Sequence, residues 1–328
     1  MVFMTPRSIL VMGAAGFLGR HASAWTYPHG AHVHLAVHHA ASVPKLPTCT
    51  ADKDVQISVC DLTSGGDVDS LVAGTRPDGV WQCAGVTTER DPSALLRVNV
   101  EGILHLCESL HHLARPCRLL IVGSAAEYGA SAQSGRMLDE TTVLSPVSLY
   151  GASKAAGWQI ATSYANRSLL SPCAARLFNV VGPGQPSTYM ASAVARQIAL
   201  IERGKQEATL VVGNTKGRRD YIDIRDAIAA CARVLECGEP GAVYNVCSGQ
   251  PTLTRDVIDS LVAMADAPIT VREGASRSSR LHEIEAIWGD NSRIREQFGW
   301  EPRYTLTESL RDLLEWWRQQ VAEDSVAG

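Results

Sequence analysis

Short apolar runs alternate with amphipathic stretches through the first half of the chain. The runs have the length and the β-branched character of buried strands. They cover residues 8–12, 32–37, 55–59, 79–82 and 119–122. Apolar residues recur with helical spacing at residues 17–27, 68–73 and 94–113. This alternation predicts a doubly wound α/β fold of the Rossmann type, a parallel sheet with helices on both faces.

The rhythm of strand and helix breaks at Gly182-Pro-Gly-Gln-Pro186, where glycine and proline interrupt regular structure. We therefore predict a Rossmann domain over residues 1–180 and a smaller C-terminal lobe that takes up most of residues 181–328. The chain is expected to return to the large sheet near residues 219–248. Further predicted elements are a helix over 149–168, a strand over 174–180, returning strands over 220–224 and 242–246, a loop or lid over 275–279 and a helix over 306–320.

Composition narrows the class of protein. The 328 residues carry a formal net charge of −4. This charge argues against nucleic acid as a main ligand, because binding to the phosphate backbone needs a basic surface. The sequence has no apolar stretch of the ~18 residues that a membrane span needs. Nine cysteines occur without CxxC spacing, so neither a metal site nor a disulfide framework is expected. We predict a cytoplasmic protein that binds neither nucleic acid nor membrane.

A glycine-rich turn, Gly13-Ala-Ala-Gly16-Phe-Leu-Gly19, follows the first predicted strand. The first glycine permits a tight turn, the second lets the backbone approach a pyrophosphate, and the third lets the helix pack against the sheet. The helix N-terminus favours negative charge. We predict a dinucleotide site that includes Gly13, Gly16, Phe17, Leu18 and Gly19.

The end of the second predicted strand bears on which dinucleotide is bound. An Asp or Glu that binds the adenine ribose is expected there in NAD enzymes, and this chain has Val37-His38-His39-Ala40 instead. A 2′-phosphate would not be repelled, so NADP(H) is favoured, with NAD(H) possible and His38 or His39 as a phosphate contact. Asp61 and Leu62 are predicted to contact the adenine side, the alternative for Asp61 being a strand-end cap.

Tyr150 and Lys154 lie four residues apart on one face of a predicted helix. A positive charge beside a tyrosine lowers its pKa, so that the phenol can exchange a proton with an alcohol or ketone. Ser124 ends a predicted strand and could hydrogen-bond the same oxygen. These residues predict an acid/base site for a substrate alcohol or ketone.

With the glycine turn and these three residues, the chain resembles the extended short-chain dehydrogenases/reductases over nearly its whole length. The resemblance implies that Tyr150 is the acid/base, that Lys154 binds the nicotinamide ribose and lowers the tyrosine pKa, and that Ser124 orients the carbonyl. Asn99, in the helix beside the site, and Ala84 complete the implied cofactor set. For Asn99, stabilisation of a helix bend is the alternative.

Segments of the second half are similar to those by which nucleotide-sugar enzymes hold their substrate. They are residues 176–179, 182–185, 213–214, 219–226 and 244–249. The combination most resembles the GDP-4-dehydro-6-deoxy-D-mannose reductases. This resemblance implies that Asn179 contacts the substrate, that Arg219 and Arg280 bind its diphosphate, and that Glu283 binds the nucleotide ribose. For Arg219 a surface salt bridge is the alternative, and Leu281 departs from the family's proline.

The function expected from the resemblance is NAD(P)H-dependent reduction of the C4 ketone of a nucleotide-linked 4-keto-6-deoxy sugar, of the GDP-4-dehydro-6-deoxy-mannose type. A nucleotide-sugar 4-epimerase with tightly bound NAD is the alternative, and a non-catalytic nucleotide-sensing protein is the minor one. A 4,6-dehydratase is not expected, because Ala125 and Ala126 replace the carboxylate it needs. Glu127 is one position further on, and alternation along an extended backbone would turn it elsewhere.

The resemblance also implies a homodimer. In the family, the helices equivalent to residues 94–113 and 149–168 pair across a two-fold axis as a four-helix bundle. Leu95, Val98, Leu106 and Leu110 are candidate contacts, and facing the sheet is the alternative for them.

Overall fold

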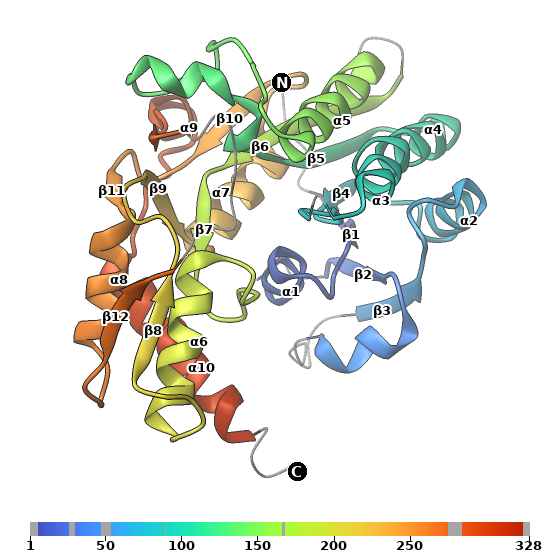
Figure 1. Cartoon of the computed structure of the whole chain (residues 1–328). Helices are drawn as coiled ribbons and strands as arrows, with labels where there is room; N and C mark the ends of the chain where they lie inside the picture. The colour runs from blue at the N-terminus through green and yellow to red at the C-terminus, as the bar shows by residue number, and fades with distance from the viewer. Residues whose placement is uncertain are drawn as a thin grey trace.

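The computed structural model describes residues 6–25, 30–46, 54–88, 90–165, 168–274 and 284–323. Within these residues, seven parallel strands form the large sheet in the order β3-β2-β1-β4-β5-β6-β10 (Figure 1). They are β1 Ser8–Met12, β2 His32–Val37, β3 Asp54–Val59, β4 Gly79–Gln82, β5 Cys117–Ser124, β6 Leu170–Leu177 and β10 Val243–Val246. The first six follow the 3-2-1-4-5-6 order of the Rossmann fold. The predicted fold class is confirmed.

Helices cover both faces of this sheet, which explains why a central strand such as β1 is almost wholly apolar. In β1, Ile9 and Val11 belong to one core, and Leu10 and Met12 belong to the core on the opposite face. The first core packs against α1 Phe17–Ala24 and α7 Ile224–Cys237, and the second against α2 Gly65–Thr75, α4 Gly102–His112 and α5 Leu149–Ala165.

The second lobe lies to one side of the large sheet and has a core of its own (Figure 1). Its helices are α6 Met190–Glu202, α8 Thr254–Ala263 and α10 Leu306–Glu323, which pack with the parallel pair β8 Thr209–Val212 and β12 Thr270–Glu273. A second small sheet contains β7 Asn179–Val181, β9 Arg218–Asp223, β11 Pro251–Leu253 and β13 Ala286–Ile287. Helix α9 spans Ser292–Phe298. Among the described helices, none has the length and apolar character to cross a membrane.

One sequence-based expectation needs correction. The strand predicted at residues 220–224 does not return to the large sheet, because β9 pairs with β7, β11 and β13 of the small sheet. Only β10 joins the large sheet from that region, beside β6. The helix predicted over residues 94–113 is present and runs without a gap as α3 Pro92–Leu96, a π-helical turn Arg97–Glu101 and α4. The loop predicted over residues 275–279 lies outside the described residues.

Three 3-10 turns complete the described secondary structure: Ala40–Lys45, Ala125–Glu127 and Ala130–Ser134. The second of them follows β5 directly and belongs to the candidate site.

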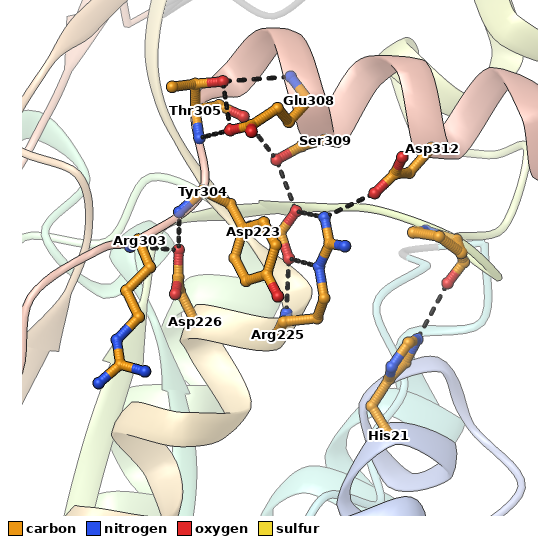
Figure 2. Close-up of polar contacts among 11 residues, drawn as sticks. His21, Asp223, Arg225, Asp226, Arg303, Tyr304, Thr305, Glu308, Ser309 and Asp312 are labelled. Carbon is orange, nitrogen blue, oxygen red and sulfur yellow. Dashed lines mark hydrogen bonds and ion pairs between the residues drawn. The ribbon is translucent and has the colours of Figure 1, made fainter.

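A buried carboxylate fastens the last helix to the large domain (Figure 2). Asp223 caps α7 by accepting a hydrogen bond from the Arg225 amide at 2.7 Å, and both of its oxygens bind the Arg225 guanidinium at 2.8 Å. It also accepts a 2.6 Å hydrogen bond from the Ser309 hydroxyl of α10. Arg225 in turn lies 3.6 Å from the ring centre of Tyr304 and 2.8 Å from the Asp312 carboxylate.

We expect Asp223→Ala to lower the free energy of unfolding by about 3 kcal/mol, because it removes the helix cap and the buried carboxylate that binds the Arg225 guanidinium and the Ser309 hydroxyl. The Asp223 side chain is 0% exposed, whereas that of Asp312, which binds the same guanidinium, is 39% exposed. The matched variant Asp312→Ala should therefore cost less than about 1 kcal/mol. Urea denaturation of the two variants measures the difference, and equal losses would contradict the role given to Asp223.

Candidate active site

The glycine turn between β1 and α1 is tight enough to exclude side chains. Gly13 has a φ of +73°, and a Cβ on it would lie 2.6 Å from the Ala84 Cα. A Cβ on Gly19 would lie 2.0 Å from the Gly13 carbonyl oxygen, while Gly16 is the exposed N-cap of α1. Phe17 and Leu18 open the helix and are partly exposed. This bare backbone at a helix N-terminus fits the pyrophosphate of a dinucleotide.

The same helix touches the segment that leads to the second lobe. Arg20 donates a hydrogen bond to the Gly184 carbonyl at 3.0 Å, and the His21 ring Nε2 lies 2.9 Å from the Pro183 carbonyl. Burial lowers the pKa of both side chains. Helix α1 therefore connects the predicted cofactor turn with the start of the lobe.

The end of β2 presents imidazoles. The rings of His38 and His39 lie 3.8 Å apart, and the His38 ring is 3.7 Å from the Asp61 carboxylate. Asp61 accepts hydrogen bonds from the Thr63 amide and hydroxyl at 2.9 and 2.8 Å, which lower its pKa. Asp61 therefore makes the hydrogen bonds of a strand-end cap, which is the alternative role that the sequence predicted for it. The Leu62 side chain is buried in the core, so an adenine contact there would come from its backbone.

Ser124 is the last residue of β5, and Tyr150 and Lys154 lie near the start of α5. Burial raises the pKa of Tyr150 to about 12, and a hydrogen bond with Ser124 opposes this rise. Burial also lowers the pKa of the Lys154 ammonium. The direction for Tyr150 is opposite to the one expected from Lys154, because burial has the largest effect on this pKa and the side chains that shift it are Ser124, Tyr189 and Glu127. The phenol therefore carries its proton at neutral pH.

Asn99 lies at the π-helical turn and is buried. Its side-chain oxygen accepts from the Val86 amide at 2.9 Å, and its nitrogen donates to the Val86 carbonyl at 2.8 Å and to the Ser153 hydroxyl at 3.0 Å. A Cβ on Gly85 would lie 3.2 Å from the Asn99 oxygen and 3.6 Å from the Lys154 ammonium. Asn99 thus connects the π-helical turn with the Val86 backbone and with Ser153 of α5, and such helix irregularities are frequent at functional sites.

The predicted substrate residues lie on the small sheet or outside the described residues. Asn179 donates a hydrogen bond to the Asp220 carbonyl at 3.1 Å, and Arg219 donates to the Arg218 carbonyl at 2.8 Å. Arg280 and Glu283 lie outside the described residues. Within the described residues, no group of three His, Cys, Asp or Glu side chains could hold a metal ion.

Two residues near the site were not predicted. Tyr189, the N-cap of α6, lies close enough to Tyr150 to raise its pKa, and no local sequence pattern marks it. Glu127 was expected to turn elsewhere along an extended backbone, but the backbone forms a 3-10 turn that brings its carboxylate to the Ser124 amide. Its carboxylate accepts from the Ser124 amide at 2.7 Å and from Arg176 at 3.0 Å. The signal was available, since Ser124-x-x-Glu127 is a capping-box sequence.

The sheet order, the glycine turn, Ser124 at the end of β5, and Tyr150 and Lys154 on α5 define an extended short-chain dehydrogenase/reductase. More narrowly, the chain belongs to the GDP-mannose 4,6 dehydratase family, whose family model matches residues 10–313.

Known proteins resemble the chain over nearly its whole length. It is 31% identical to a GDP-6-deoxy-D-mannose reductase of Pseudomonas aeruginosa, an alignment that covers 98% of this chain and 100% of that protein. The solved structure of RMD from Pseudomonas aeruginosa complexed with NADPH matches with a TM-score of 0.80 and 28% identity, over 95% of this chain and 99% of that one. A UDP-glucose 4-epimerase of Thermus thermophilus in complex with NAD matches with a TM-score of 0.82 and 25% identity, over 94% and 98% of the two chains.

Proposed function

We propose that the protein reduces the C4 ketone of a nucleotide-linked 4-keto-6-deoxy sugar, of the GDP-4-dehydro-6-deoxy-mannose type. The observation that carries the proposal is the full-length similarity to a GDP-6-deoxy-D-mannose reductase. The site is consistent with it, because Tyr150 forms a hydrogen bond with Ser124 and the Gly13 turn fits a dinucleotide.

The chain's residues supply the acid half of the reaction. NADPH, when bound, supplies the hydride that the ketone carbon accepts. The Tyr150 hydroxyl gives its proton to the ketone oxygen, and the Ser124 hydroxyl donates a hydrogen bond to the same oxygen as negative charge develops there. The Lys154 ammonium, on the same helix face as Tyr150, stabilises the phenolate that remains. Asn99 holds the neighbouring helix turn in place.

NADP(H) is the proposed cofactor, and NAD(H) is the alternative. Residues 37–40 at the end of β2 contain no acid to repel a 2′-phosphate, and His38 and His39 provide two imidazoles there. The RMD structure is a complex with NADPH, while that of the Thermus epimerase is a complex with NAD. We propose that Gly13, Gly16, Gly19, Ala84 and the 61–62 segment line the same cofactor site.

The 4-epimerase alternative makes a different demand on the cofactor. An epimerase removes a hydride and returns it, so it benefits from a nicotinamide that never leaves, whereas a reductase must exchange its cofactor in every cycle. The test is to purify the protein, denature it, and assay the supernatant for nicotinamide, alongside turnover of added NADPH with a GDP-4-keto-6-deoxy sugar. NADPH consumption with little retained cofactor is expected. Stoichiometric NAD⁺, with interconversion of two sugar nucleotides without NADPH, would identify an epimerase, and no turnover in either assay would favour a nucleotide sensor.

We expect no 4,6-dehydratase activity, although the family is described by that reaction. Dehydration needs a carboxylate just after the strand-end serine to move the C5 proton, and positions 125 and 126 are alanines. Glu127 is engaged by the Ser124 amide and Arg176. Incubation with GDP-mannose and NAD⁺ or NADP⁺ should give no 4-keto-6-deoxy product by mass spectrometry. Detection of that product would overturn the assignment.

For substrate binding we propose Asn179, Arg219, Arg280 and Glu283, the arginines for the diphosphate because a guanidinium suits bidentate phosphate binding.

We also propose a homodimer through α4 and α5, with different contacts from those first considered. Leu95, Leu106 and Leu110 are buried within the protomer, which agrees with the alternative that they face its interior and not a second protomer. Leu96 and Leu104 are the large apolar residues of α3 and α4 that remain exposed, at 47% and 39%.

A further inference from the structure

The geometry points to Glu127 as a positioning residue for the reduction, which holds the Ser124 backbone so that the Ser124 hydroxyl meets the Tyr150 phenol. This inference rests on the proposed function, because it assigns Ser124 and Tyr150 to the reacting ketone.

The carboxylate of Glu127 binds the strand end directly. One oxygen accepts a 2.7 Å hydrogen bond from the Ser124 amide, and the Ser124 hydroxyl accepts one from the Ala126 amide at 3.2 Å. This reciprocal capping fixes the turn that carries Ser124 away from β5. A hydroxyl has a single hydrogen to donate. Because the Ser124 hydroxyl accepts the hydrogen bond from the Ala126 amide, its own hydrogen is left to donate to Tyr150 or to the ketone.

The other carboxylate oxygen is anchored in the sheet. It accepts from Arg176 of β6 at 3.0 Å, and the side chains of Glu127 and Arg176 are only 2% and 3% exposed. Arg176 also donates to the Tyr128 hydroxyl at 2.9 Å, and that hydroxyl lies 2.7 Å from the side-chain oxygen of Asn245 in β10. The Ser124 turn is therefore tied to two neighbouring strands of the large sheet by a buried polar network.

Two further observations connect this carboxylate with the site. A Cβ on Gly123 would lie 2.7 Å from the Glu127 oxygen. Because Gly123 has no side chain, the Glu127 carboxylate has room beside the strand end. The negative charge of Glu127 also raises the pKa of Tyr150 and that of Lys154. It thereby favours the protonated phenol and the charged ammonium, the forms that a ketone reduction uses.

The experiment compares two variants of Glu127 with a control. Glu127→Gln keeps the shape but has one acceptor oxygen for the two donors, Ser124 N–H and Arg176 Nε–H. The double variant Glu127→Met with Arg176→Met removes the acceptor without leaving a buried charge, so that it folds even if the single variant does not. Glu202→Gln is the control, because it weakens another ion pair, with Arg318 at 2.7 Å between α6 and α10.

Both Glu127 variants should lower kcat about 10-fold, the scale of a misplaced hydrogen-bond donor, with KM for NADPH within about two-fold of wild type. Neither should lower kcat further in a Ser124→Ala background, because Glu127 acts through Ser124. The control should keep wild-type kcat. Wild-type kcat in both Glu127 variants, or an equal loss with and without the Ser124 hydroxyl, would overturn the inference.

Hydrogen exchange of the Ser124 amide tests the positioning without any substrate. It should accelerate about ten-fold or more in the double variant, because a buried hydrogen bond to that amide is lost, and stay unchanged in Glu202→Gln. If the wild-type protein reduces no keto-sugar nucleotide, the proposed function fails and this exchange result alone decides the role of Glu127. An unchanged Ser124 exchange rate overturns it.

Discussion

Replacing Tyr150 by phenylalanine is expected to lower turnover about 100-fold or more while NADPH affinity stays close to wild type. The substitution removes one oxygen from a largely buried ring, so it takes away the proton donor with little change in packing. Because burial raises the pKa of this phenol to about 12, the hydroxyl remains protonated across the neutral range. Steady-state rates of NADPH oxidation and NADPH titrations by fluorescence measure the two effects separately.

The matched control is Tyr164→Phe, on the same helix α5. Tyr164 is buried and its hydroxyl binds the Glu108 carboxylate, away from Ser124 and Lys154 in sequence and in contacts. This variant should keep wild-type turnover even if its stability falls. Wild-type turnover in Tyr150→Phe would show that the proton comes from elsewhere.

Arg176→Met is expected to lower the free energy of unfolding by about 3–5 kcal/mol, because it leaves the Glu127 carboxylate charged and buried without its partner. The loss should be recovered largely by adding Glu127→Met, which restores an uncharged interior of similar volume. Urea denaturation followed by circular dichroism measures both variants.

The exposed pair Arg255–Asp259 provides the comparison. Its side chains are 45% and 55% exposed, so Arg255→Met should change stability by less than about 1 kcal/mol. If Arg176→Met were as stable as Arg255→Met, Glu127 would not be held in the interior as a charged group.

The sequence was most informative where local pattern and burial agree. Strands β1, β2 and β4 begin and end at the predicted residues, because short apolar runs between turns are buried on both faces of a parallel sheet. The glycine turn was predictable as well, since its spacing follows from backbone sterics. Strand β9 was assigned to the wrong sheet, because an apolar run does not reveal which distant strand it will pair with.

In the candidate site, too, local sequence patterns were predictive and contacts between distant segments were not. Tyr150 and Lys154 share a helix face, so their spacing alone brings them together. Tyr189 reaches Tyr150 only through the packing of the second lobe, and no spacing rule connects them. Glu127 was misjudged because an extended backbone was assumed after β5, while Ser124 instead begins a tight turn. The raised pKa of Tyr150 depends on burial, which residue spacing does not report.

The core of the second lobe is assembled from segments far apart in the chain, which bears on the order of events during synthesis. The last strand of the large sheet, β10, ends at Val246, whereas α10, which covers α6 and α8, begins only at Leu306. As the chain leaves the ribosome, every strand of the large sheet has emerged while the apolar faces of α6 and α8 still lack their cover. We therefore expect a protein truncated before Leu306 to keep these apolar faces exposed and to aggregate.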